Sequence, residues 1–142
     1  MTISGSVDAR VVEPVSITAI DDLRFGAMMS PATAGIVEIA SDGTVTSNLD
    51  ISSFPGGRGP ARFTVLGDPN RRFLVFAPNQ ILISNGSATM QVDRFRANTF
   101  FGLGRFNNVG SFDLYVGGRL NVGANQAVGQ YSGTFNVTVL YL

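Results

Sequence analysis

Alternation of apolar and polar residues dominates the chain and predicts β-strands rather than helices. No segment of ten or more residues carries a helical stripe once its glycines and prolines are taken into account. Apart from the segments beside the tight turns described below, strands are expected at residues 15–20, 23–27, 62–66, 73–76 and 131–141. Many short strands separated by turns are typical of a β-sandwich. The chain is therefore predicted to be all-β.

Three glycine-containing pairs between alternating segments predict tight hairpins. They are Asp42-Gly43, Asn85-Gly86 and Gly117-Gly118. Each pair tolerates the positive φ angles that two-residue turns require. Two stretches lack alternation and are expected to be loops, at residues 52–60 and 98–110. The second loop carries Phe100, Phe101 and Phe106, which either pack the loop onto its own sandwich or contact a neighbour or a surface ligand.

The first thirteen residues form a separate alternating unit. One row is apolar or small and consists of Ile3, Gly5, Val7, Ala9 and Val11; the intervening row is polar. Pro14 interrupts the hydrogen-bonding potential of the backbone, and a second alternation starts at Val15. The pattern predicts an N-terminal strand, residues 1–13, joined by a short bend to a body that covers residues 14–142.

The carboxyl-terminal end shows the same pattern. Its apolar row consists of Tyr131, Phe135, Val137, Val139 and Tyr141, with Gly133 in the same register. A strand at the edge of a sandwich exposes unpaired N–H and C=O groups and part of the core beneath them. We therefore expect another strand to cover this edge.

Two arrangements would cover the edge, and they correspond to different functions. In the first, residues 3–11 fold back into their own domain and complete a monomeric sandwich, for example a surface-binding or carbohydrate-binding module. In the second, the segment is donated to another copy, so that the chain polymerises head to tail. The alternation is compatible with both.

Composition excludes most enzyme chemistry. The chain has 142 residues, which suits a single domain, and contains no Cys, His, Trp or Lys. It therefore lacks thiolate and imidazole nucleophiles and bases, Schiff-base lysines, and the usual ligands of zinc, copper, haem and iron-sulfur clusters. Carboxylates are the remaining candidates, with Asp21, Asp22 and Asp68 the nominal ones. We expect a protein that is not an enzyme and holds neither a metal nor a cofactor.

Charge and hydropathy further restrict the classes of partner that we expect. Ten arginines balance ten carboxylates, so the excess positive charge that nucleic-acid binding requires is missing. No apolar run is long enough to cross a bilayer. We therefore expect neither a nucleic-acid partner nor a membrane span.

Several segments together resemble a bacterial pilin-like domain family of uncharacterised function, akin to spore-coat-U-like proteins and archaic chaperone-usher pilins. They are Leu23-Arg24-Phe25-Gly26, Phe63-Thr64-Val65-Leu66-Gly67, Val116-Gly117-Gly118-Arg119-Leu120 and the ending from Gly129 to Tyr141. The likeness covers nearly the whole chain. It departs from many archaic pilins in having no cysteine and therefore no disulfide.

The resemblance implies an immunoglobulin-like, pilin-type antiparallel β-sandwich completed by a donated N-terminal strand. It implies a structural subunit of an extracellular, cell-surface filament, exported through the periplasm after removal of a leader. Its partners would be identical subunits, with a periplasmic chaperone and an outer-membrane usher during assembly. The N-terminal apolar row would be the donor, and the row from Tyr131 to Tyr141 would line the acceptor groove.

Overall fold

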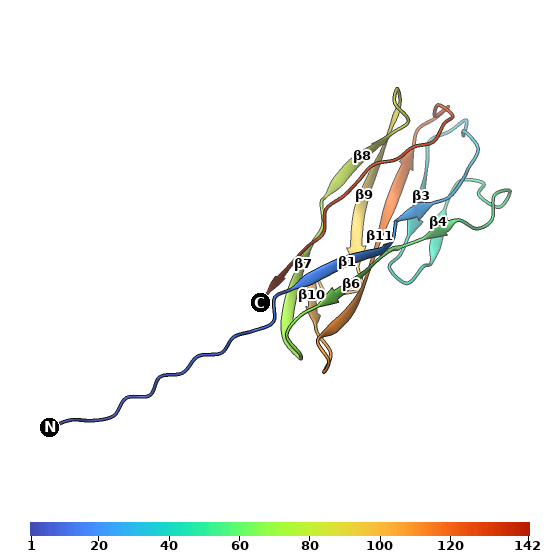
Figure 1. Cartoon of the computed structure of the whole chain (residues 1–142). Coiled ribbons are helices and arrows are strands. Elements are labelled where there is room, and N and C mark those ends of the chain that lie inside the picture. Colours follow the sequence, from blue (N-terminus) through green and yellow to red (C-terminus); the bar gives the residue numbers. More distant parts are fainter.

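The computed structural model describes residues 1–142 and is all-β, as predicted. Its twelve strands are β1 (Ser16–Asp21), β2 (Arg24–Phe25), β3 (Gly35–Ile39), β4 (Val45–Ser47), β5 (Arg58–Gly59), β6 (Ala61–Leu66), β7 (Arg72–Phe76), β8 (Gln80–Ser84), β9 (Thr89–Ala97), β10 (Leu103–Arg105), β11 (Ser111–Val122) and β12 (Thr138–Tyr141). All strand pairs are antiparallel, and the sheets pack face to face as in a β-sandwich (Figure 1). No helix is long and apolar enough to cross a membrane.

The long strand β11 organises the largest sheet. One edge pairs first with β6 and then with β3, while the other edge pairs with β9, which in turn pairs with β8. The sheet continues outward from β6 to β1 and from β3 to β4. A second sheet has the order β10-β7-β12, and a short ribbon pairs β2 with β5. The chain thus places β1 and β12 at the ends of two different sheets.

The core lies between these sheets and consists of the inward rows of the strands. Its largest fully buried side chains are Phe73, Phe106, Ile39, Leu114 and Leu120. The ring of Phe73 packs against Phe106 and Phe112, with centroid separations of 4.6 and 5.0 Å. Alternation along β11 and β7 therefore gives each strand one buried row, which is what stabilises the sandwich.

Two of the three predicted hairpins are confirmed. The pair Asp42-Gly43 connects β3 to β4, and Asn85-Gly86 connects β8 to β9. Gly43 and Gly86 have φ angles of 91° and 103°, which glycine adopts without steric cost. Turn chemistry at these positions was sufficient to predict the local structure.

The third predicted hairpin, at Gly117-Gly118, is wrong, because β11 runs straight through both residues. A Cβ atom on Gly117 would lie 2.0 Å from the carbonyl oxygen of Ile39, and one on Gly118 would lie 3.1 Å from Leu23. A bulge in the neighbouring β9, where Arg94 has a φ of 49°, shifts the register opposite these glycines. The glycines are needed for close approach rather than for a turn.

Replacing Gly117 by alanine should therefore destabilise the body by about 3 kcal/mol, the upper range for overpacking a core. Denaturant titration of the variant checks this value. Gly5→Ala is the matched control, because no atom lies within 4 Å of the Cβ position at Gly5. An unchanged unfolding midpoint for the Gly117 variant would contradict the account of these glycines.

Smaller differences concern the loops and the last strand. The predicted loops at 52–60 and 98–110 contain β5 and β10. The predicted strand at 131–141 is regular only in β12, preceded by a single bridge between Ser132 and Ser84. Between these points, residues 133–137 pair with no strand. Alternation alone did not show that the ladder would be interrupted there.

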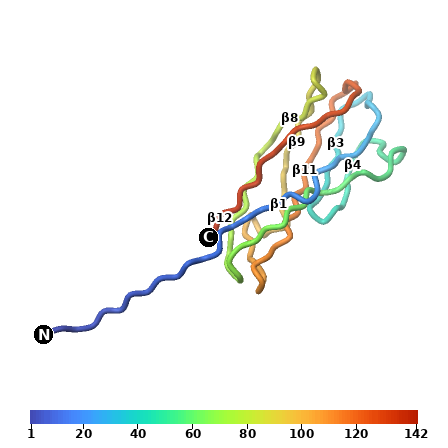
Figure 2. The backbone as a smooth tube through the Cα atoms, viewed as in Figure 1, coloured from blue at the N-terminus to red at the C-terminus, as the bar shows by residue number.

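The first fifteen residues form no strand, and all but the last few of them project from the body; Val15 already packs against the core. They leave it at the end where β1 begins, close to the end of β12, and extend away from both sheets (Figures 1 and 2). We call residues 1–13 the N-terminal extension. Because the extension points away from the sheets, it does not reach the strands with which it would pair in a self-contained sandwich.

Candidate interaction site

The N-terminal extension presents its apolar row entirely to solvent. Ile3, Val7 and Val11 are 92%, 99% and 98% exposed, and Gly5 and Ala9 in the same row are exposed as well. Alternation keeps these five residues on one side of an extended backbone. In a single copy this row contacts nothing, so the predicted donor residues have no partner in their own body.

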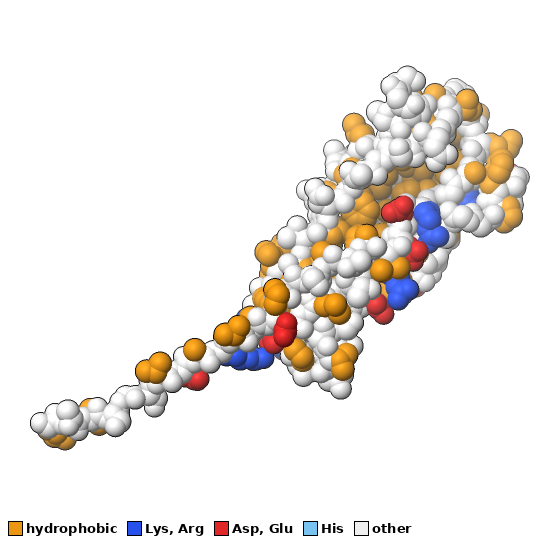
Figure 3. Space-filling view, in the orientation of Figure 1, with side chains coloured by type: hydrophobic (Ala, Val, Ile, Leu, Met, Phe, Trp, Pro, Cys, Tyr) orange, Lys and Arg blue, Asp and Glu red, His pale blue; other side chains and the backbone are white.

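An open groove of about 860 Å³ lies along the body. One wall comes from β1, β2 and the residues after them, and the other wall is the segment 127–135. Apolar side chains line its interior: Leu23, Phe25, Met28, Phe63, Ile81, Ile83, Met90, Val92, Phe95 and Leu120. Figure 3 shows apolar side chains in the hollow between β1 and the segment 127–135. The groove therefore leaves a layer of half-buried apolar side chains, packed against the core, open to solvent.

Both walls of the groove have unpaired backbone edges. β1 pairs with β6 on one side only, since it is the last strand of its sheet. On the opposite wall, the segment 133–137 forms no ladder. An extended segment inserted between these walls would meet N–H and C=O groups on both sides and apolar side chains beneath it.

The structure divides the predicted acceptor residues into two groups. Tyr131 and Phe135 line the groove, and the Phe135 ring packs against Phe95 with a centroid separation of 4.9 Å. Val137, Val139 and Tyr141 are half-buried against the core but do not line the groove. All five belong to the inward row, and only its first part faces the open space.

Sequence reasoning missed the rest of the groove. Leu23, Phe25 and Met28 form the wall beside β1, while Phe63 and Val92 lie on the floor. Leu23, Phe25 and Phe63 fall within predicted strands and Met28 lies just beyond one; all of them pack against the core. Nothing in the pattern distinguished an inward residue beneath a neighbouring strand from one beneath an open gap.

A small polar cluster fixes the base of the extension to the body. The Tyr141 hydroxyl accepts a hydrogen bond from the backbone N–H of Asp68 at 2.7 Å and donates one to the Glu13 carbonyl oxygen. The Arg10 guanidinium donates to the Asp68 carboxylate at 2.6 Å. The Arg71 guanidinium lies over the Tyr141 ring, 4.7 Å from its centroid. We call Arg10, Glu13, Asp68 and Tyr141 the base latch; it holds the extension where it leaves the body.

Removal of the Tyr141 hydroxyl tests the base latch. Tyr141→Phe leaves the buried backbone N–H of Asp68 without its acceptor, so the body should lose about 1–2 kcal/mol of stability in denaturant titrations. Residues 10–13 should also become more mobile in backbone NMR relaxation. Tyr115→Phe is the control, because that residue contacts Arg62 through its ring rather than through its hydroxyl. Unchanged stability and mobility in the Tyr141 variant would show that the latch has no mechanical role.

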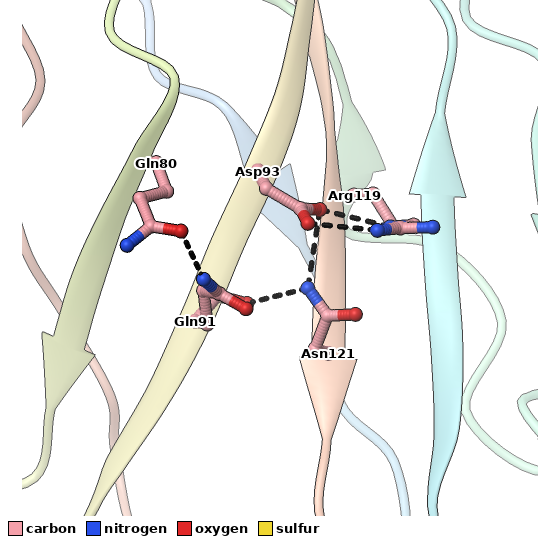
Figure 4. Close-up of polar contacts among 5 residues, drawn as sticks. All are labelled: Gln80, Gln91, Asp93, Arg119 and Asn121. Carbon is pink, nitrogen blue, oxygen red and sulfur yellow. Dashed lines mark hydrogen bonds and ion pairs between the residues drawn. The ribbon is translucent and has the colours of Figure 1, made fainter.

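A separate polar network lies across β8, β9 and β11 (Figure 4). Arg119 binds Asp93 through two hydrogen bonds of 2.8 and 2.7 Å, and Asn121 donates to the same carboxylate at 3.1 Å. Gln91 donates a hydrogen bond to Gln80. The hydrogen bond from Arg119 holds the pKa of Asp93 below its ordinary value. Both oxygens of this carboxylate are paired, so the network ties β9 to β11.

The pKa direction gives a pH dependence. A carboxylate whose pKa is lowered in the folded state adds stability that is complete above its unfolded value, about 3.8, and that disappears as pH falls through the lowered pKa. Wild type should therefore lose more stability than Asp93→Asn between pH 5 and pH 2, chosen as about one to two units on either side of that value. Urea titrations across this range measure the difference. Parallel pH profiles of the two proteins would contradict it.

The carboxylates considered for catalysis do not form a common site. Asp21 and Asp22 lie at the rim of the groove, whereas Asp68 is only 5% exposed and is paired with Arg10 in the base latch. The chain contains no group of three or more acidic, His or Cys side chains placed to hold a metal ion. The strongest feature of the surface is thus the apolar groove, together with the projecting apolar row.

These features define an all-β protein whose sandwich is left open along one groove and which carries a projecting extended segment. Residues 15–141 match the family described as Domain of unknown function (DUF4402), and the chain belongs to this family. The matched region begins next to β1, just after the extension. Comparisons with curated proteins and with solved structures find no match.

Proposed function

We propose that the protein is a structural subunit of an extracellular bacterial filament, in which the N-terminal extension of one copy fills the groove of the next. The observation that carries the proposal is that one chain holds both an unpartnered apolar row and an open apolar groove. In a single copy the apolar row has nothing to pack against, and the groove has no strand to fill it. Because donor and acceptor lie on opposite parts of the chain, the contact is head to tail and does not close on itself.

The extension has the chemistry that the groove requires. Burying its five apolar positions would remove about 400 Å² from water, on the order of 10 kcal/mol. Ordering eleven backbone residues costs about the same, at roughly 1 kcal/mol each. These contributions nearly cancel, so the net affinity depends on backbone hydrogen bonds to both walls and on completing the core.

The base latch favours donation over self-insertion. To lie beside β1 of its own body, the extension would have to reverse direction near Pro14. That reversal would break the contacts of Glu13 with Tyr141 and of Arg10 with Asp68. The latch instead holds the extension pointing away from the body (Figure 2). Donation to another copy keeps these contacts.

An open groove also suggests what assembly requires. Before a neighbour fills it, the groove leaves half-buried apolar side chains such as Phe63 and Ile83 open to solvent and is an aggregation hazard. A periplasmic chaperone that lends a strand, and an outer-membrane usher that replaces it with the next subunit, would protect the groove during export. We include both as proposed partners, with the cell surface as the proposed location.

Electron microscopy of the purified full-length chain, combined with mass photometry across a dilution series, tests the proposal. Filaments that persist on dilution are expected, because withdrawal of a whole strand is slow. A monodisperse monomer at every concentration, with residues 3–11 protected from hydrogen exchange, would overturn it. That result would instead identify a self-contained sandwich that acts as a binding module.

A further inference from the structure

The outer face of the β10-β7-β12 sheet is apolar, although it lies away from the groove. Register places Leu103 beside Leu74 and Leu74 beside Leu140, so these leucines form one row across the three strands. Phe73 and Val139 occupy the opposite, core-facing row. The outer row continues into Phe76, which is 51% exposed. We call Leu74, Phe76, Leu103 and Leu140 the outer apolar face.

A hairpin tip beside this face displays two more aromatic rings. Phe100 and Leu103 exchange backbone hydrogen bonds of 3.1 and 2.9 Å around the two residues Phe101 and Gly102. Phe101 and Gly102 have φ angles of 52° and 82°, the left-handed pattern of a type I′ turn. Asn, Asp or Gly normally occupies the first of these positions, whereas a bulky residue is strained there.

Phe101 gains little burial within its own chain to offset this strain. Its side chain is 91% exposed and that of Phe100 is 74% exposed, and the two rings contact each other at a centroid separation of 4.8 Å. Strained residues in sparsely populated backbone regions cluster where a function is served. The ring of Phe101 therefore points to a partner outside the chain.

The charges around this face indicate what kind of partner it is. Arg72 lies directly opposite Arg105 on neighbouring strands, a placement that costs stability between like charges. Neither takes part in an ion pair, since the three pairs of the chain involve Arg10, Arg62 and Arg119. No carboxylate occurs in β7, β10, β12 or the tip at residues 98–102. The face thus combines uncompensated positive charge with exposed apolar area.

We propose that this face docks onto the surface of an anionic lipid membrane. Arginines beside exposed aromatic and aliphatic side chains suit a headgroup layer, where phosphates meet the guanidinium groups and the rings enter the interface. A second copy of the chain is the other candidate occupant, since it carries exposed carboxylates beside apolar side chains, such as Asp8 in the extension. The experiment below distinguishes the two, because a contact between copies does not require lipid. The proposal does not depend on filament formation.

Flotation of the full-length protein with vesicles on a density gradient tests the proposal, because filaments without lipid do not float. Vesicles of phosphatidylcholine with about 30% of the anionic lipid phosphatidylglycerol are compared with phosphatidylcholine alone, because a negative surface potential attracts basic residues. We expect flotation with the anionic vesicles and at least about fivefold weaker binding for each of Arg72→Gln and Arg105→Gln. Equal flotation with both vesicle types, or none with either, would overturn the proposal.

Phe101→Asn gives the sharpest variant, because it separates binding from folding. Asparagine suits the turn, so the variant should unfold at the same or a higher temperature than wild type while binding anionic vesicles about tenfold more weakly or worse. Val109→Ser, at an exposed apolar position in another turn, is the matched control and should float like wild type. Undiminished flotation of Phe101→Asn would contradict the proposal. A Phe101→Asn variant that floats normally but no longer self-associates would also contradict it, because the face would then be a contact between copies.

Discussion

A chain from which residues 1–12 are removed and then joined after Leu142 through a short linker should be a stable monomer. The chain ends at the same end of the body from which the extension leaves (Figure 1), so the relocated segment can run back along the segment 127–137 into its own groove. Insertion adds about eight ladder hydrogen bonds at roughly 1 kcal/mol each. We expect the unfolding temperature to rise by roughly 15–30 °C over that of the chain lacking residues 1–12.

The control replaces the apolar row of the relocated segment, Ile3, Val7 and Val11, by serine. Its backbone could still pair, but it would leave the floor of the groove uncovered, so most of the stabilisation should be lost. Differential scanning calorimetry and size-exclusion chromatography measure both chains. If the relocated segment gives no stabilisation, or if the chain without residues 1–12 is already a stable soluble monomer, the groove does not require a strand.

Val7→Asp should abolish polymerisation without disturbing the body. Val7 is 99% exposed and contacts nothing in its own copy, so the substitution has no effect on folding. In the groove of a neighbour, an aspartate would be buried among apolar side chains without a counter-charge, at a cost of several kcal/mol. We expect the affinity between copies to fall by more than about a hundredfold. Light scattering and electron microscopy measure assembly, and thermal unfolding monitors the body.

Ser6→Asp is the matched control for this variant. It adds the same charge one residue earlier, on the polar row that faces solvent in a donated strand. It should therefore assemble almost as well as wild type. Equal loss of assembly in both variants would show that charge, rather than burial of the apolar row, is responsible; normal assembly of Val7→Asp would remove the extension from the interface.

Local chemistry predicted much of the fold. Alternation gave the strands, and the turns at Asp42-Gly43 and Asn85-Gly86 followed from glycine's tolerance of positive φ. Gly117-Gly118 has the same local signature but serves a different purpose, because Gly117 admits the backbone of β3 and Gly118 admits the side chain of Leu23. That requirement comes from tertiary packing, which no short window of sequence contains.

Of the two parts of the candidate site, the extension and the groove, the sequence predicted only the extension. The alternation from Ile3 to Val11 is local, and the sequence therefore predicted the apolar row of the extension directly. The groove depends on which edges remain unpaired after folding, so neither the gap between β1 and the segment 127–135 nor the roles of Leu23 and Met28 could be derived from spacing. The base latch also joins residues from both ends of the chain, Glu13 and Tyr141, and no periodicity connects them.

Disulfide trapping between two differently marked copies tests the central claim most directly, because the chain contains no cysteine of its own. One variant carries Ser4→Cys, Ser6→Cys or Asp8→Cys in the polar row of the extension, and the other carries Thr134→Cys on the groove wall. Neighbouring strands bring facing Cβ atoms within disulfide range. When the variants are mixed and oxidised during assembly, at least one combination should yield a product that joins one copy of each. If Thr134→Cys joins to no extension cysteine of another copy, and doubly substituted chains link only within themselves, the extension does not fill a neighbour's groove.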